Sequence, residues 1–369
     1  MSGYGKDHPA DDTPYERMRF YIREVGQGPK ACRDLTREEA REAMEMILRQ
    51  EVTPAQIGGF LLIERFKGES AEELLGFADA IRAHAHQIAP GVDGLLDIGS
   101  PYDGRKHSLV VSPAASIVAC AGGVPVVMHG EKGMGPKHGI PVGDVLGALG
   151  VDVDAGPEEV RRSIEEDGFG YMRSARFVPN LYALKEVREE IALRSNIHTI
   201  EKLYNLAGAS YSLIGLTHLP YMEKMLEAVK EMGFRRIMLV QGIEGNEDAP
   251  TSRPCRVFEW SGGEMREYRL NPQEYNLAPA SKEEMAGGDA AYNADVCVRV
   301  LEGAPGPHRD LVCLNAGLRI YLAERAADIG EGITKARAAI DSGAAREKLE
   351  ALRKRAGTQR RLTLADGAR

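Results

Sequence analysis

The first ninety residues carry apolar positions at helical spacing, interrupted by short polar connections. In the segment 36–51, apolar residues such as Met44 and Ile47 fall on one face of a helix. Thr36 and Glu39 stand three residues apart at its start, the spacing of a capping box that satisfies free backbone N–H groups. The pattern predicts an amphipathic helix that buries one face.

Two further helices follow within the same region. The first begins at Thr53 as N-cap, with Pro54 at its first helical position and Gly68 as its end. The second begins with another capping box, formed by Ser70 and Glu73. Because the connections between the three helices are very short, we expect them to pack as a small helical unit.

After residue 90 the pattern changes to short apolar runs of strand length, at 95–98, 125–128 and 236–241. Helical patterns lie between and after these runs, at 112–123, 221–233, 309–326 and 333–357. This alternation predicts a parallel sheet covered by helices, with ligands at the carboxyl ends of the strands. The segment 256–270 is more typical of a hairpin, so we expect part of the sheet to be antiparallel.

The overall charge gives no reason to expect binding to nucleic acid or to an acidic membrane. The 369 residues include 47 Lys and Arg against 55 Asp and Glu, for a formal net charge of -8. Any anion site must therefore be local. With 43% hydrophobic residues, the chain can bury a large core, and we expect two structural units.

The cysteines and the apolar runs bear on the cellular compartment. The five cysteines are odd in number and have no CxxC spacing, which favours reduced thiols over a disulfide framework or a zinc site. The first twenty residues contain no apolar core of a signal peptide, and no later run approaches the length of a membrane span. We therefore expect a cytoplasmic protein without membrane contact.

The loop after the first predicted strand has the features of a phosphate site. It leaves the strand near residue 98, contains Gly99 and Gly104, and enters a helix near Ser112. A helix N-terminus offers free N–H groups and a positive dipole end to an anion, and Arg105 and Lys106 add cations. The alternative is a surface turn whose charges are solvated.

The loop after the second predicted strand is similar. His129 and Gly130 end the strand, and Lys132, Lys137 and His138 follow among glycines. Two cationic loops that end two separate strands favour a common anion site over two unrelated solvated turns.

A third loop follows the strand at 236–241 and is acidic, with Glu244, Glu247 and Asp248. Carboxylates beside a phosphate site suit magnesium, a hard ion that prefers oxygen ligands and is often shared with substrate phosphates. We expect these side chains to be exposed in the loop. The alternative is a solvated acidic turn.

These residues carry a resemblance to a known family. The chain resembles anthranilate phosphoribosyltransferase and other family-three glycosyltransferases, including the thymidine-phosphorylase type, over nearly its whole length. The segments with the strongest likeness are 144–160, 184–194, 306–323 and 338–352. The resemblance implies an α/β fold with a small all-helical domain, the anthranilate phosphoribosyltransferase-like fold.

The same resemblance implies domain boundaries and partners. The helical domain would comprise residues 1–90 with a returning piece near 185–208, and would form a homodimer. The α/β domain would comprise 91–184 and 209–369. The substrate cleft would lie between the domains, and the α/β side would bind phosphoribosyl pyrophosphate with Mg²⁺ beneath an aromatic acceptor.

The resemblance can be carried over residue by residue in the first loop. The family pattern D-I-V-G-T-G-G-D-G is matched by Gly99, Ser100 and Asp103, which we expect at the phosphates together with Arg105 and Lys106. Two family glycines that allow close approach of the backbone are replaced by Pro101 and Tyr102.

In the second loop the family pattern K-H-G-N-R is matched by His129, Gly130 and the cation Lys132, which we expect to bind substrate. The family asparagine is replaced by Glu131. Arg188 matches the arginine that meets the anthranilate carboxylate, while Val178 stands near the position of the acceptor histidine. The acceptor is therefore expected not to be anthranilate.

For the metal, the resemblance implies a magnesium shell of Asp103, Ser112, Glu247 and Asp248, in which the last two stand for an Asp-Glu pair. The transfer that the resemblance implies would need no covalent enzyme nucleophile, and no catalytic residue is assigned. The segment 194–199 also has the R-x-x-x-H-T form of a divergent branch, the YbiB-like paralogues. The resemblance to this branch implies a divergent paralogue.

Three functions remain open at this point. The first is pentosyl transfer from phosphoribosyl pyrophosphate to an altered acceptor. The second is a non-enzymatic homodimer that binds single-stranded DNA or RNA, for which the basic run at 346–361 is a candidate contact. The third is a nucleoside phosphorylase-type activity. A phosphorylated small molecule is the ligand of the first and third.

Overall fold

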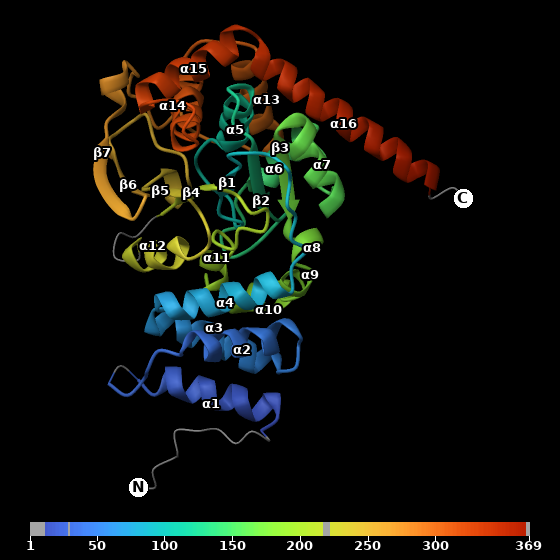
Figure 1. Ribbon diagram of the computed structural model, residues 1–369, viewed down its shortest axis with the longest axis vertical. Helices are drawn as coiled ribbons and strands as arrows, with labels where there is room; N and C mark the ends of the chain where they lie inside the picture. Colours follow the sequence, from blue (N-terminus) through green and yellow to red (C-terminus); the bar gives the residue numbers. More distant parts are fainter. Residues whose placement is uncertain (1–11, 29, 217–221, 367–369) are drawn as a thin grey trace.

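The computed structural model describes residues 12–28, 30–216 and 222–366, with side chains as far as residue 359. Its N-terminal part is a layer of helices at the bottom of Figure 1, below the sheet. The layer consists of α1 (Pro14–Gly26), α2 (Arg37–Leu48), α3 (Pro54–Lys67) and α4 (Ala71–Ala83).

Each of these helices begins at a capping box. The predicted boxes of α2 and α4 are confirmed, and α3 begins at Thr53 and ends at Gly68 as predicted. The helix α1 was missed, although Thr13 and Glu16 form the same signal before it, with Pro14 in the first turn. A capping box is therefore a reliable start signal in this chain.

The described residues form one seven-stranded sheet in the order β3-β2-β1-β4-β5-β6-β7. The pairs from β3 to β5 are parallel, whereas β5 to β7 pair antiparallel. This confirms the predicted parallel sheet with an antiparallel hairpin. The strands are β1 (Leu96–Gly99), β2 (Val126–Gly130), β3 (Phe169–Arg173), β4 (Tyr211–Gly215), β5 (Arg236–Val240), β6 (Cys255–Ser261) and β7 (Glu264–Leu270).

One face of the sheet packs against the C-terminal helices. Val126 and Met128 of β2 belong to this core, as do Met238 and Val240 of β5. The covering helices are α5 (Ser112–Ala121), α6 (Val142–Ala148), α13 (Ala290–Leu301), α14 (Pro307–Leu322), α15 (Ile329–Asp341) and α16 (Ala344–Asp366). The far end of α16 projects away from the body in Figure 1.

The other face of the sheet shares a core with the helical layer. Val127 of β2 and Ile237 and Leu239 of β5 lie in this second core, together with residues of α1 to α4. Successive residues of one strand thus point into different cores, as the pleat requires. The remaining helices are α7 (Pro157–Asp167), α8 (Ser174–Phe177), α9 (Pro179–Tyr182), α10 (Lys185–Ile191), α11 (Ile197–Ile200), α12 (Met222–Lys230) and the single turns η2 (Ile243–Gly245) and η3 (Pro272–Tyr275).

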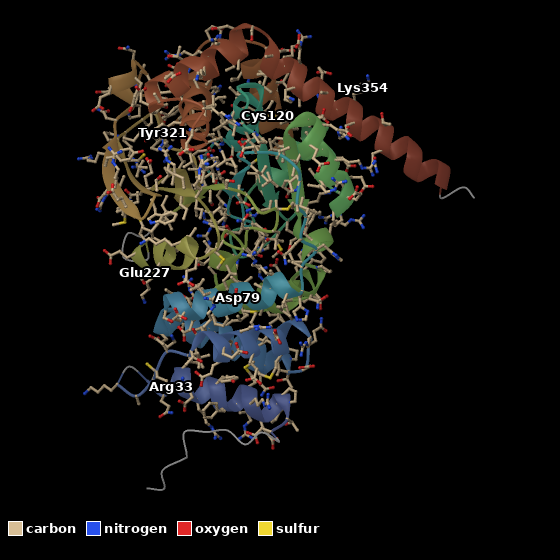
Figure 2. The ribbon with its side chains drawn as sticks, viewed as in Figure 1. Arg33, Asp79, Cys120, Glu227, Tyr321 and Lys354 are labelled. Atoms are coloured by element: carbon tan, nitrogen blue, oxygen red, sulfur yellow. The ribbon has the colours of Figure 1, made fainter. Side chains whose placement is uncertain are left out.

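The segment expected to return to the helical unit does contact it. In particular, α10 packs against α3 and α11 packs against α4. The helix α12, which lies outside that segment, also packs against α4. The domain boundaries at 90, 185 and 208 stay a prediction. Within the described part of the chain, no helix is long and apolar enough to cross a membrane. All five cysteines carry free thiols, and Cys120 is labelled in Figure 2.

Candidate functional site at the carboxyl ends of the strands

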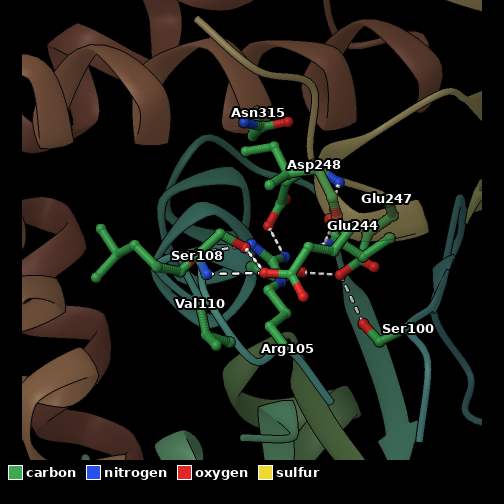
Figure 3. Close-up of polar contacts among 12 residues, drawn as sticks. Ser100, Arg105, Ser108, Val110, Glu244, Glu247, Asp248 and Asn315 are labelled. Carbon is green, nitrogen blue, oxygen red and sulfur yellow. Dashed lines mark hydrogen bonds and ion pairs between the residues drawn. The ribbon is translucent and has the colours of Figure 1, made fainter. Parts of the chain in front are cut away.

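The acidic loop after β5 folds back against the loop after β1. Figure 3 shows Glu247 and Asp248 facing Ser100 and Arg105 from that loop. The expectation that these carboxylates are exposed is wrong, because both Glu247 and Asp248 are 0% exposed. Buried carboxylates need hydrogen bonds or counter-charges, and these come from three separate segments of the chain.

Glu247 is held by two serine hydroxyls. Ser100 Oγ donates to Glu247 Oε1 over 2.6 Å, and Ser112 Oγ donates to the same oxygen. Ser112 is the first residue of α5, so it approaches the carboxylate from the helix N-terminus. The second oxygen, Oε2, is buried and has no hydrogen-bond partner.

Asp248 is held by two guanidinium groups. Arg105 Nη2 contacts Asp248 Oδ2, and Arg319 Nη2 lies 3.2 Å from Asp248 Oδ1. Arg319 comes from α14, is fully buried, and also donates to Ser112 Oγ over 2.7 Å. Together, these five residues form what we call the ionic cluster: Arg105, Ser112, Glu247, Asp248 and Arg319.

A neighbouring acid binds the backbone of the first loop. Glu244 accepts hydrogen bonds of 2.8–3.0 Å from the N–H groups of Lys106, His107 and Ser108, and a further one from Ser108 Oγ. Although burial alone would raise its pKa, these bonds lower the pKa of Glu244 to about 2. The predicted phosphate-binding N–H groups around Lys106 are thus occupied by a carboxylate of the chain itself.

Asp103 is separated from the acidic pair by its own partner. Arg194 donates hydrogen bonds to both carboxylate oxygens of Asp103, from Nε over 2.8 Å and from Nη2 over 2.6 Å, in a bidentate arrangement. The following glycine, Gly104, has φ +70°, and a Cβ there would lie 2.5 Å from the carbonyl carbon of Ile140. This close crossing of two loops fixes where Asp103 stands.

His129 lies in a buried hydrogen-bonded chain. Its Nε2 lies 3.1 Å from Asp97 Oδ1, and its Nδ1 lies 3.0 Å from the hydroxyl of Tyr102. The Tyr102 hydroxyl also contacts that of Tyr204. Burial raises the pKa of Tyr102 well above its usual value. Tyr102, which replaces a family glycine, therefore forms a hydrogen bond with Nδ1 of His129, the histidine predicted to bind substrate.

The predicted glycines pack against the protein itself. A Cβ on Gly99 would lie 3.2 Å from the carbonyl oxygen of Lys202, and one on Gly130 would lie 2.8 Å from the hydroxyl of Tyr171. Neither position therefore tolerates a larger side chain without movement. The absence of a side chain at Gly99 and Gly130 therefore lets Lys202 and Tyr171 pack closely, and it would equally allow a ligand to approach.

Lys132 lies away from the ionic cluster. Its Nζ is 3.0 Å from Asp154 Oδ2, and it lines a separate open cavity of about 850 Å³. Glu131 beside it accepts a hydrogen bond of 2.6 Å from Arg173 and one of 2.8 Å from the N–H of Ala175. Glu131 is therefore part of an internal network.

Arg188 is also committed to a partner inside the protein. Its guanidinium forms a bidentate pair with Glu201 at 2.6 and 3.0 Å, and both residues are buried. His198 lies beside Arg188, with Nε2 3.1 Å from the carbonyl oxygen of Gly135. Burial, together with the charge of Arg188, lowers the pKa of His198 to about 3. This histidine is neutral at physiological pH.

Between the helical layer and the sheet lies a cavity of about 470 Å³, which we call the interlayer cavity. The end of α3 contributes Arg65 and Phe66 to its wall, and the α3–α4 connection contributes Glu69. The sheet side contributes Asp103, Arg194, Lys202 and Gly215 near the ends of β1 and β4. Lys202 Nζ donates to the carbonyl oxygen of Gly215 over 3.1 Å.

Lys202 is the most unusual cation of this cavity. Burial, followed by the charge of Arg194, lowers the pKa of its ammonium to about 8. It has no carboxylate partner among the hydrogen bonds and ion pairs that the structure describes. The charges of Glu247 and Asp103 act on it in the opposite sense, but neither contacts it directly. A desolvated ammonium that has no direct carboxylate contact and lines a cavity favours an anionic ligand.

Comparison with known proteins agrees with this architecture. Residues 99–346 match the family model described as glycosyl transferase family, α/β domain, and residues 19–85 match the helical bundle domain of the same family. The chain belongs to this glycosyl transferase family.

Relatives in this glycosyl transferase family cover most of the chain. The anthranilate phosphoribosyltransferase of Methanocorpusculum labreanum is 40% identical over 321 residues, 86% of this chain and 93% of the relative. That of Mesorhizobium japonicum is 36% identical over 91% of this chain and 97% of the relative. The resemblance inferred from the motifs is confirmed. Divergence as a separate branch stays a prediction.

Solved structures of the glycosyl transferase family share the fold. The Thermus thermophilus anthranilate phosphoribosyltransferase superposes with a TM-score of 0.80 at 32% identity, covering 92% of this chain and 99% of that chain. The Saccharomyces cerevisiae enzyme in complex with PRPP and Mg has a TM-score of 0.82 at 19% identity, covering 93% and 98%. The predicted α/β fold with a helical domain is confirmed.

The predicted magnesium ligands do not fit a metal ion in this arrangement. Arg194 occupies both oxygens of Asp103, and two arginines occupy those of Asp248. Only Glu247 Oε2 is unpartnered among their carboxylate oxygens, and it is buried, whereas Mg²⁺ is usually held by one or two carboxylates together with several waters and substrate phosphates. No group of three or more His, Cys, Asp or Glu in the described part of the chain could hold a metal.

Three residues of the site were missed from the sequence: Arg194, Lys202 and Arg319. Arg194 opens the segment 194–199, which was noted only for its form. Lys202 lies eight positions after Arg194 and belongs to no recognised motif. Arg319 stands inside the apolar run of α14, and a lone charge in a buried helix could have signalled a buried partner.

Proposed function

We propose that this chain transfers a phosphoribosyl group from phosphoribosyl pyrophosphate to an acceptor other than anthranilate. The observation that carries the proposal is the interlayer cavity at the carboxyl ends of β1 and β4, with Lys202 as an ammonium that contacts no carboxylate directly. Relatives that are anthranilate phosphoribosyltransferases at 40% and 36% identity support the reaction class. The complex of the yeast enzyme with PRPP and Mg supports the donor.

Lys202 is the residue that would hold the phosphates. Lys202 lines the cavity. Arg194 lines the same wall, where it forms an ion pair with Asp103. In the transfer, negative charge grows on the departing pyrophosphate, and a fixed ammonium in a partly desolvated site stabilises that charge. Mg²⁺ would enter bound to the pyrophosphate and neutralise part of its charge.

The acceptor side of the cavity differs from one built for anthranilate. Arg188, the residue expected to meet the anthranilate carboxylate, is buried in its pair with Glu201. Phe66 lines the cavity from the helical layer with 81% of its surface exposed. An exposed ring at a cavity mouth suits stacking on a flat acceptor, so we propose an aromatic acceptor that lacks a carboxylate contact with Arg188.

Calorimetric titration of the full chain with phosphoribosyl pyrophosphate and Mg²⁺ tests the donor. We expect saturable binding that the substitution Lys202→Met weakens by about 10- to 100-fold, since a charged hydrogen bond is worth about 1.5–3 kcal/mol. Lys335→Met, which removes a partly exposed lysine paired with Glu331, is the matched control and should bind as the wild type. Absence of binding to the wild-type protein would overturn the proposed function.

The acceptor needs a separate assay. Consumption of phosphoribosyl pyrophosphate would be followed in the presence of anthranilate and of aromatic amines and bases without a carboxylate. We expect turnover with a member of the second group and none with anthranilate. Turnover with anthranilate would contradict the proposed acceptor class while leaving the donor in place.

A further inference from the structure

We propose that Arg105 and Arg319 take the place of a divalent cation beside Glu247 and Asp248, so that the family's acidic pair acts in this chain as an internal counter-charge. The inference concerns the ionic cluster alone and holds whether or not the proposed transfer occurs. It goes beyond the proposed function because it assigns the acidic pair to a network that a metal ion does not enter.

The charges of the cluster balance without a metal. Glu247 and Asp248 supply two negative charges, and Arg105 and Arg319 supply two positive ones, all with side chains almost fully buried. Adding Mg²⁺ to this buried group would leave an excess positive charge in a poorly solvated place. A metal site in which the pair met the ion would instead need the two guanidinium groups elsewhere.

Both arginines are anchored where they stand. Arg105 Nη1 donates to the carbonyl oxygen of Leu109 over 2.6 Å, and Arg319 Nη1 donates to that of Asn315 over 2.9 Å. Arg319 also reaches Ser112, another of the predicted metal ligands. Arg319 lies in the last turn of α14 and has no exposed surface, so its guanidinium is shielded from solvent.

The acidic loop is held in place as well. Asn315 of α14 clamps Ala249, the residue after Asp248, by accepting from its N–H over 2.7 Å and donating to its carbonyl oxygen over 3.0 Å. Figure 3 shows Asn315 above Asp248. The one unpartnered carboxylate oxygen, Glu247 Oε2, is buried, so water cannot complete a coordination shell around an ion there.

The test is titration of the full chain with Mn²⁺, followed by the electron paramagnetic resonance of the free ion, with no phosphate compound present. We expect no saturable binding to the wild-type protein. Arg319→Met removes one guanidinium while keeping much of its bulk. It leaves Asp248 Oδ1 without its arginine partner and Ser112 Oγ with Glu247 alone. We expect this variant to gain one saturable Mn²⁺ site, which the wild-type protein lacks, and to be stabilised by the ion.

Arg309→Met is the control, because Arg309 pairs with the exposed Asp341 and lies outside the cluster. It should gain no Mn²⁺ site. A saturable Mn²⁺ site in the wild-type protein that Glu247→Gln abolishes would overturn the inference, and so would a folded Arg319→Met protein that gains no site. If Arg319→Met does not fold, the wild-type and Glu247→Gln titrations still decide.

Discussion

The ionic cluster and the interlayer cavity are built from the same kinds of residue, at the same edge of one sheet. They differ in whether their cations are paired with a carboxylate of the protein. In the cluster, every guanidinium meets a carboxylate inside the protein. In the cavity, Lys202 has only a carbonyl oxygen as its described partner. The cluster therefore has no free guanidinium for an anionic ligand, whereas the cavity has an ammonium without a direct carboxylate contact that an anion can neutralise.

The difference shows that a charged loop at the end of a strand does not by itself identify a ligand site. Glu247 and Asp248 matched the family's metal residues in type and spacing, while Lys202 matched no motif. What separates them is direct contact with a counter-charge, which depends on distant segments such as α14. Local sequence cannot report that balance.

The largest effect that sharpens the comparison is expected for Asp248→Ala. This change leaves two buried guanidinium groups with one carboxylate, and removing one partner of a buried ion pair costs about 3–5 kcal/mol. Chemical denaturation of the full chain measures the free energy of unfolding. Asp341→Ala, which removes the exposed partner of Arg309, should cost less than about 1 kcal/mol. Equal losses in the two variants would break the comparison.

The next effect concerns ligand binding. Lys202→Gln should weaken binding of phosphoribosyl pyrophosphate by about 10- to 100-fold, because it removes the charge and keeps a polar group. The free energy of unfolding should stay the same or rise, since the buried ammonium has no direct carboxylate contact. Calorimetry and denaturation of the same preparation give both values. A large loss of stability with unchanged affinity would assign Lys202 to the scaffold.

The pH dependence should separate binding from stability. The pKa of Lys202 is lowered to about 8 from a usual value of 10.5, so the folded protein loses this proton at lower pH than the unfolded chain. Between pH 8 and 10.5 the lysine therefore makes stability rise with pH, while affinity for the phosphates falls by up to about tenfold per pH unit. The difference between wild type and Lys202→Met isolates this contribution, and parallel profiles would contradict it.

A smaller effect is expected from Tyr102→Phe, which removes one hydroxyl from the buried chain with His129 and Tyr204. Loss of a partner for a buried polar group costs about 1–3 kcal/mol. Thermal unfolding measures the loss, and Tyr182→Phe, in the short helix α9, provides a control without a described hydroxyl bond. An unchanged melting temperature would mean that His129 finds another partner.

The smallest effect is expected at the basic C-terminal helix. Arg355 already pairs with Glu166 and Asp167, and Arg353 pairs with Glu350. Replacing Arg353, Lys354 and Arg355 with Gln should cost at most about 1 kcal/mol. The predicted oligonucleotide contact would show as affinity for single-stranded DNA that falls log-linearly with salt, with a slope that this variant flattens. Arg360 and Arg361, also part of that prediction, lie outside the described side chains.

The sequence predicted the fold well because its signals are local. Capping boxes at Thr36 and Ser70 and the period of the apolar residues depend on neighbours within a few positions. The missed helix α1 carries the same signal at Thr13, so it was available and overlooked. The hairpin predicted for the segment 256–270 is confirmed by the antiparallel pairing of β6 and β7.

The candidate site was predicted only in part, for a physical reason. Motif matching placed Ser100, Ser112 and the acidic pair together, and these do meet. It could not show that Arg105 points at Asp248, since a side chain's partner depends on the crossing of segments 143 residues apart. The burial of Glu247 and the pairing of Arg188 with Glu201 are likewise products of tertiary packing.

Because successive side chains of β2 pack into two different cores, the unfolding of the two cores is coupled through this strand. Val127 packs with the helical layer while Val126 and Met128 pack with the C-terminal helices, so neither core can loosen without exposing the same strand. Amide hydrogens of β2 should therefore exchange with solvent only in the slowest, whole-molecule opening, and those of α2 should approach the same limit.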